Sequence, residues 1–280
     1  MSPAAARAAS VPAAAAVALV LLLTPGAPAR AQAGGEGAVP FPPPLASPLE
    51  PHTRLAPVHI SRGDRRRWVG LVDLGDRIAI PLARPREGRP LAVAASVAGG
   101  VFSRFDLEDN GNELVEAHYR VGVRLRARLG GVVGRLELRH VSSHLGDEFL
   151  ERTGRAPVST SREGVELLVQ GRPGRDLRVY GGPGLVVRST EGLDAPSVRG
   201  GLEWRPGGPG SGGFVPYASV EAFAWEELDW DPSLTSEAGV AFGGGHVRLA
   251  LTAGTGPSRA EQFFRDGAET LWGLSLSVTR

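Results

Sequence analysis

The sequence predicts an all-β protein: a closed antiparallel transmembrane β-barrel of about twelve strands, with about ten as the alternative. Three observations predict this fold class. Long stretches alternate between apolar and polar residues. Short glycine turns alternate with longer polar loops. No stretch after residue 31 has the length and apolar character of a transmembrane helix. A hydrophobic content of 42% fits a barrel, because half of each strand is polar.

The first 31 residues have the features of a secretory signal peptide. Arg7 provides the positive charge, residues 13–23 form a short apolar core, and Ala29-Arg30-Ala31 resembles a cleavage site. The chain contains no cysteine, which excludes disulfides, thiolate zinc sites and a lipidated N-terminal cysteine. Residues 32–64 are rich in proline and glycine and are predicted to form a periplasmic linker. Residues 65–280 are predicted to form the barrel.

Strands are expected wherever apolar residues recur at every second position between turn residues. They are predicted at residues 66–74, 77–84, 91–107, 113–130, 132–144, 160–171, 174–189, 195–206, 213–226, 233–243, 245–256 and 269–280. Many of them are longer than the roughly five or six residues of a strand in a soluble sheet. They match the roughly nine to eleven residues that a tilted strand needs to cross a bilayer.

The clearest pair of strands lies on either side of Gly130-Gly131. From Val115 to Leu129 every odd position is apolar and every even position is charged, polar or glycine. Glycine tolerates the positive φ of a tight hairpin turn, so the chain should return directly from residue 132 to residue 144. Counting back through the turn places Arg124 opposite Glu137 and Val121 opposite His140. The apolar face should contact lipid, and the charged face should line or fill the interior.

The connections predict how the barrel sits in the membrane. Short turns at residues 130–131, 171–174 and 243–245 fall on one side, and mostly longer loops fall on the other, among them residues 145–159. Bacterial outer-membrane barrels have short periplasmic turns and longer external loops. The sequence therefore predicts an integral protein of the bacterial outer membrane with both termini in the periplasm.

The interior is predicted to contain charges of both signs. The expected inward arginines are Arg120, Arg124, Arg126, Arg128, Arg135, Arg139, Arg178 and Arg199, and the expected inward glutamates are Glu116, Glu137, Glu203, Glu221 and Glu237. The arginines would favour a small anion channel, whereas arginine–glutamate pairs would fill the lumen. The sequence favours a filled lumen and leaves the channel as an alternative.

Several segments resemble an uncharacterised family of bacterial outer-membrane β-barrels, catalogued as domain of unknown function 1207. The matching segments are Gly100-Val101-Phe102 through Leu107, Tyr119-Arg120-Val121-Gly122, Ser142-Ser143-His144-Leu145-Gly146-Asp147-Glu148-Phe149, Val179-Tyr180-Gly181-Gly182, Asp229-Trp230-Asp231 and Gln262-Phe263-Phe264-Arg265-Asp266. They extend from about Trp68 to the end of the chain. The resemblance implies a barrel in the outer membrane and implies no particular activity.

Three polar residues are predicted to share the lipid-facing side. Strand phase places His140 and Ser142 outward, and it places Glu163 outward on the next strand, opposite or diagonal to them. A serine, a histidine and a carboxylate at one level are the components of a nucleophilic catalytic site. His140-Val141-Ser142 is similar to the His-x-Ser motif of outer-membrane phospholipase A and lipid A deacylase. Those families usually follow the serine with Asn-Gly, whereas Ser143-His144 follows here.

The specific prediction is a serine acyl hydrolase acting on phospholipid or lipid A of the outer leaflet. The alternatives are the small channel and a non-catalytic envelope or assembly barrel. A bulge that turned His140 and Ser142 inward, toward Arg139 and Tyr180, would favour a structural role. No cofactor or metal is predicted, although His144, Asp147 and Glu148 leave an external calcium site open. The predicted partners are outer-membrane lipid and the barrel-assembly machinery. A net charge of +1 implies no nucleic acid, and the oligomeric state is left open.

Overall fold

A computed structural model describes residues 39–80, 82, 91–109, 111–157, 160–190, 195–207 and 213–279. The predicted signal peptide lies outside these residues. None of the helices in the described ranges is long and apolar enough to cross a bilayer.

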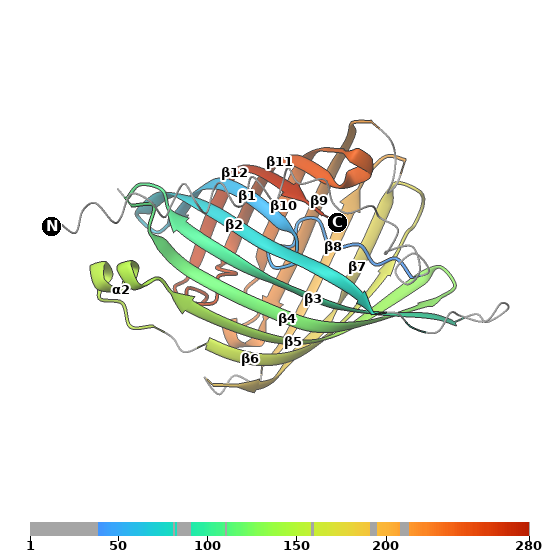
Figure 1. Ribbon diagram of the computed structural model, residues 1–280, viewed down its shortest axis with the longest axis horizontal. Coiled ribbons are helices and arrows are strands. Elements are labelled where there is room, and N and C mark those ends of the chain that lie inside the picture. Colours follow the sequence, from blue (N-terminus) through green and yellow to red (C-terminus); the bar gives the residue numbers. More distant parts are fainter. Residues whose placement is uncertain are drawn as a thin grey trace.

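Twelve antiparallel strands form one closed barrel in which each strand pairs with its neighbours in sequence and β1 pairs with β12 (Figure 1). The strands are β1 Thr53–Arg62, β2 Arg65–Ile80, β3 Leu91–Asp106, β4 Leu114–Leu129, β5 Val132–Leu145, β6 Thr160–Gly171, β7 Leu177–Ser189, β8 Pro196–Trp204, β9 Val215–Trp225, β10 Ser233–Phe242, β11 Val247–Pro257 and β12 Ala268–Val278. The short helix α2, Asp147–Thr153, follows β5. Its end of the barrel is called the helix end, and the end with Gly130-Gly131 is called the turn end.

The alternation in β4 and β5 produces the two faces that the sequence predicts. Arg124 and Arg126 of β4 are buried inside the barrel, while the side chains of Val123 and Leu125 are exposed on the outer wall. Gly130 has φ of 60°, in the left-handed region that the tight turn requires. Arg124 pairs with Glu137 and Val121 pairs with His140, so the predicted register is confirmed.

The prediction for the N-terminal part of the barrel is wrong at two points. Residues 53–62, predicted as linker, form β1, and residues 65–80 form one strand rather than two. β1 departs from the usual barrel pattern because its inward side chains Ala56, Val58 and Ile60 are apolar. They pack inside the barrel against Val69 of β2, so this strand does not have the alternation that marks the others.

Residues 39–52, hereafter the plug, lie inside the barrel instead of forming an extended linker (Figure 1). Near the turn end, Val39 and Phe41 are buried in an apolar cluster with Ala94, Val133 and Leu168. The prolines of this run cannot donate backbone hydrogen bonds to a ladder, and their carbonyls accept from the wall instead. The side chains of Gln170 and Arg178 donate to the Pro40 and Pro42 oxygens at 2.8 and 2.7 Å.

The plug leads to an expectation for conductance. The wild-type protein in planar bilayers should show no large, stable single-channel steps, because chain and buried ion pairs occupy the lumen. Deleting residues 39–49 while keeping β1 should produce such steps, since it removes the apolar filling of the turn end. Large, long-lived steps from the intact protein would contradict the filled lumen and favour the channel.

Candidate functional site

The three residues predicted for catalysis lie together on the outer wall. His140 is exposed and Ser142 is half-buried on the outward face of β5, and Glu163 is exposed on β6. His140 pairs directly with Glu163, and Ser142 pairs with Ser161. Opposed residues on adjacent strands have Cβ atoms roughly 4.5–5.5 Å apart, which brings the imidazole and carboxylate within reach of each other. The predicted outward placement and the predicted strand pairing are confirmed.

No bulge turns this part of β5 inward. The pairing of β5 is continuous with β4 and with β6. The irregularity lies one strand away, where β6 and β7 shift register between Glu163 and Gly164. Ser143 is the inward neighbour: it is buried, and its hydroxyl donates to Glu116 Oε1 at 2.7 Å. The alternative that placed His140 and Ser142 in the interior network is therefore wrong.

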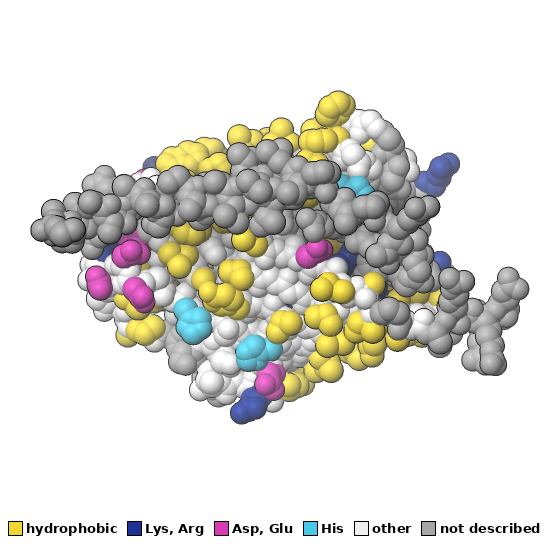
Figure 2. All heavy atoms as spheres, viewed as in Figure 1, with side chains coloured by type: hydrophobic (Ala, Val, Ile, Leu, Met, Phe, Trp, Pro, Cys, Tyr) yellow, Lys and Arg dark blue, Asp and Glu magenta, His cyan; other side chains and the backbone are white. Residues whose placement is uncertain are grey.

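The polar row continues on both sides of these residues. Arg188 of β7 pairs with Glu163, and its Nη1 atom lies 3.9 Å from Glu163 Oε1. His144, two residues beyond Ser142 on the same face, packs edge-on against Tyr119 of β4, with ring centroids 6.1 Å apart. On this wall, histidine side chains lie beside an acidic and a basic side chain and are bordered by hydrophobic ones (Figure 2).

The row lies near the helix end, because β5 ends at Leu145 and β6 begins at Thr160. Toward the turn end, the same face continues with exposed Leu138 and Leu136 of β5 and with Leu167 of β6. Polar side chains on a lipid-facing wall are tolerated best near the interface, where their cost falls to about 0–1 kcal/mol. His140, Ser142 and Glu163 thus lie where an apolar wall meets the polar rim.

A second concentration of charge fills the middle of the lumen. Glu50 of the plug is completely buried, with guanidinium nitrogens of Arg124, Arg135 and Arg199 at 2.9, 2.8 and 2.7 Å. Burial raises the pKa of Glu50, but these arginines and Arg120 together lower it well below its usual value. Arg124 also lies 3.0 Å from Glu137, as the filled-lumen prediction requires.

Glu50, Glu137 and Glu166 are the one group of acidic or histidine side chains in the described ranges close enough together to hold a metal ion. Arginines already surround all three, for example Arg135 at 2.8, 3.5 and 3.1 Å, respectively. These cations satisfy the carboxylates, so the cluster is an ion-pair network. The calcium alternative at His144, Asp147 and Glu148 is not among such groups in the described part of the chain.

The sequence prediction missed Glu50, His118 and Arg259. Glu50 lay in a proline-rich stretch that shows no periodicity. Arg259 belongs to the loop between β11 and β12, where residues 258, 261, 262, 263 and 264 are buried. A polar loop with two consecutive phenylalanines, Phe263-Phe264, was the signal that this segment folds back into the barrel.

Solved structures with a similar fold are outer-membrane barrels. Outer membrane phospholipase A from Escherichia coli is 15% identical with a TM-score of 0.54, over 85% of this chain and 93% of that chain. The outer membrane phospholipase dimer of Salmonella typhi with bound calcium is 15% identical with a TM-score of 0.53, over the same shares. LpxR from Salmonella typhimurium is 12% identical with a TM-score of 0.43, over 81% of this chain and 100% of that chain.

The closed twelve-strand barrel, with its apolar outer wall and charged interior, therefore has the fold of an outer-membrane β-barrel. The chain belongs to the family described as "Protein of unknown function (DUF1207)", which matches residues 64–278. The resemblance drawn from the sequence is confirmed. No curated protein matches the sequence.

Proposed function

We propose that this protein is a serine acyl hydrolase that cleaves ester-linked fatty acids from lipids of the outer leaflet. The observation that carries this proposal is the outward row on adjacent strands, with His140 and Ser142 on one strand and Glu163 directly opposite His140. The three side chains are on the face that meets lipid. The similarity of the fold to that of an outer membrane phospholipase supports the proposal.

Each side chain has a distinct role in the reaction. The Ser142 hydroxyl oxygen attacks the ester carbonyl carbon while the His140 imidazole takes the hydroxyl proton. The Glu163 carboxylate orients the imidazole and stabilises its positive charge. When the tetrahedral intermediate collapses, the ester C–O bond breaks and His140 gives its proton to the leaving alcohol oxygen.

The second half of the reaction releases the fatty acid. A water molecule attacks the Ser142 acyl ester as His140 takes a water proton, and the same proton returns to the Ser142 oxygen on collapse. His144 lies on the far side of Ser142 from His140 along the same outward face. We assign its ring N–H the role of donor to the developing oxyanion, since Ser143-His144 stands where the resembling enzymes usually carry Asn-Gly.

The location proposed for the active site is the external leaflet. The helix end would face outward if the turn end, with its short turns, faces the periplasm. An outward triad at that rim reaches a membrane-embedded ester without extracting the lipid. The anion channel has less support, since the plug and the Glu50 cluster occupy the lumen.

Comparing membrane lipids tests this function. Cells expressing the wild type, Ser142→Ala or an empty vector should be compared by mass spectrometry of their outer-membrane lipids. Only the wild type should accumulate free fatty acid, together with lysophospholipid if phospholipid is the substrate or under-acylated lipid A if lipid A is. Identical acylation in all three strains would leave a barrel without this activity.

Replacing Glu163 should reduce the hydrolase activity, but by less than replacing the nucleophile Ser142. Glu163→Gln keeps the size of the side chain and removes the charge that stabilises the imidazolium. We expect a loss of kcat of more than about tenfold, but less than for Ser142→Ala. Glu148→Gln is the matched control, since Glu148 is an exposed acid of α2 at the same end. Equal activity of Glu163→Gln and wild type would remove Glu163 from the site.

A further inference from the structure

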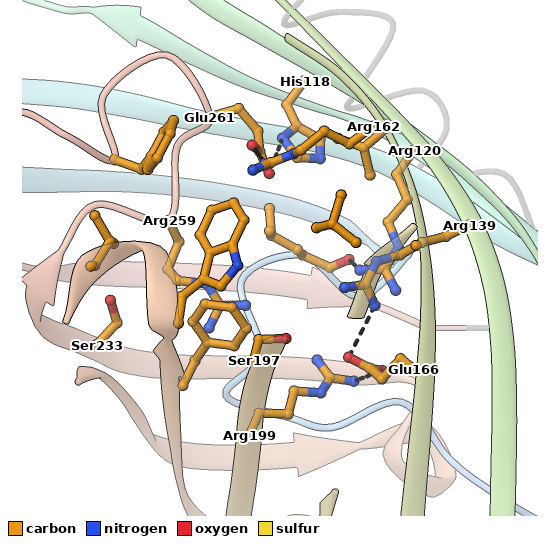
Figure 3. Close-up of a pocket in the computed structure, with 18 of the residues that line it drawn as sticks. His118, Arg120, Arg139, Arg162, Glu166, Ser197, Arg199, Ser233, Arg259 and Glu261 are labelled. Atoms are coloured by element: carbon orange, nitrogen blue, oxygen red, sulfur yellow. Dashed lines mark hydrogen bonds and ion pairs between the residues drawn. The ribbon is translucent and has the colours of Figure 1, made fainter. Parts of the chain in front are cut away.

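A cavity of about 80 Å³ lies inside the barrel between the plug and the loop that joins β11 to β12. Its walls include Arg120, Arg139, Arg162, Arg199 and Arg259, which come from β4, β5, β6, β8 and that loop (Figure 3). Leu49 of the plug and Phe264 of the loop also line it. The cavity is thus an arginine-rich space on the inner side of the wall. Glu166, Glu261 and Glu163 of the outward row also border it.

The ion pairs around this cavity leave an excess of positive charge. Contacts within 4.0 Å join six arginines and four glutamates into one network: Arg120, Arg124, Arg135, Arg139, Arg199 and Arg259 with Glu50, Glu137, Glu166 and Glu221. Among the described residues, these six cations and four anions leave a surplus of two positive charges. The neighbouring pair of Arg162 and Glu261 adds no net charge. Buried charge without a counter-charge is costly, so this network favours binding of an anion.

Arg259 is the least compensated member of the network. Among the described residues, the one carboxylate within 4.0 Å of its guanidinium is Glu221, at 3.7 Å. The guanidinium lies 3.9 Å from the centroid of the Phe223 ring, and this stacking leaves its in-plane N–H groups free to donate toward the cavity. Burial lowers the pKa of Arg259 to about 10, and the nearby Arg199 and Arg139 contribute to the same direction.

A buried histidine shares this space. His118 of β4 lines the cavity and is 2% exposed, and neither ring nitrogen has a hydrogen-bond partner among the described residues. Its nearest carboxylate is Glu261, with Nδ1 at 3.7 Å from Oε1. Asp231 also lies at the cavity wall, but it is exposed. Polar groups that are buried without partners favour an occupant that can hydrogen-bond to them.

We propose that this cavity is a binding site for a small oxyanion, inorganic phosphate, held chiefly by Arg259 with Arg139 and Arg199. Planar guanidinium groups match the oxygen geometry of phosphate and bind it with paired, charge-assisted hydrogen bonds. A bound phosphate would offset the two surplus positive charges and tie the β11–β12 loop to β5 and β8. The arginines that would hold the ligand extend into the inside of the barrel, so we assign the ligand as the free ion rather than a headgroup.

Equilibrium dialysis with radiolabelled inorganic phosphate, at constant ionic strength and with the folded barrel in detergent micelles, tests this site. The wild type should bind phosphate saturably, and Arg259→Gln should bind it at least about tenfold more weakly. Arg265→Gln is the matched control, since Arg265 is an exposed arginine of the same loop that pairs with Glu227. The affinity of Arg265→Gln for phosphate should stay within about twofold of that of the wild type.

Glu221→Gln keeps the test decisive if Arg259→Gln does not fold. Removing the carboxylate that competes for Arg259 should tighten phosphate binding by about fivefold or more, whereas a purely structural role for this pair predicts no tightening. Absence of saturable binding to the wild type would overturn the proposal, as would equal affinity of the wild type, Arg259→Gln and Glu221→Gln. Competition by phosphatidylglycerol added to the micelles would overturn the assignment to the free ion.

Discussion

Ser142→Ala should reduce fatty-acid release from phospholipid in mixed micelles by at least about 1,000-fold, because the alanine variant has no nucleophile for the acyl-enzyme. The matched control is Ser161→Ala. Ser161 has the same side chain on the same outward face and pairs with Ser142 across the two strands, but it has no proposed role. Activity of Ser161→Ala close to that of the wild type would show that the loss does not come from altering the wall.

The double variant His140→Ala/Ser142→Ala tests whether the two side chains act together in catalysis or independently. If His140 acts only through the Ser142 hydroxyl, His140→Ala and Ser142→Ala should each reduce kcat by about as much as the double variant does. Additive losses would contradict the base–nucleophile pair. Equal rates for Ser142→Ala and the wild type would contradict the proposed function itself.

Glu50→Gln should have the largest effect on stability, about 3–5 kcal/mol, because it leaves Arg124, Arg135 and Arg199 buried around a neutral side chain. Urea unfolding of the barrel in lipid vesicles measures this change. Glu151→Gln, at an exposed position of α2, is the control and should change stability by less than about 0.5 kcal/mol. Equal unfolding midpoints for Glu50→Gln and the wild type would contradict the role of the cluster.

The same carboxylate predicts a dependence on pH. The folded protein holds the pKa of Glu50 below its value in the unfolded chain, which is about 4.3. Its stabilisation is therefore complete above that pH and is lost as pH falls toward the lower folded value. Acidification below about pH 4 should destabilise the wild type more than Glu50→Gln, which has no carboxylate to protonate at this position.

Much of the wall and of the outward row could be predicted because period-two alternation determines which face each side chain occupies. Leu136 and Leu138 determine the face of His140 and Ser142, and Leu167 does so for Glu163. The Gly130-Gly131 turn then sets the register that pairs Arg124 with Glu137. The face of a side chain and the register of a hairpin depend on residues that are close in sequence or paired across one hairpin.

The plug and β1 could not be predicted by the same reasoning. Ala56, Val58 and Ile60 face inward although they are apolar, so β1 lacks the apolar–polar alternation that predicts the other strands. Glu50 is stabilised by arginines from β4, β5 and β8, and the sequence before β1 contains no periodic signal for such contacts. The contacts of Arg259 could not be predicted either, because its partners Glu221 and Phe223 lie in β9, far away in the sequence.

Covalent labelling tests the central claim most directly. A fluorophosphonate with a long alkyl chain should react with the wild-type barrel in micelles, since a serine activated by a histidine attacks phosphorus and retains the adduct. Peptide mass spectrometry should place the adduct on Ser142, and His140→Ala should abolish labelling although Ser142 is still present. Absence of an adduct on the folded wild type, or labelling that persists in His140→Ala, would contradict a His140–Ser142 catalytic pair.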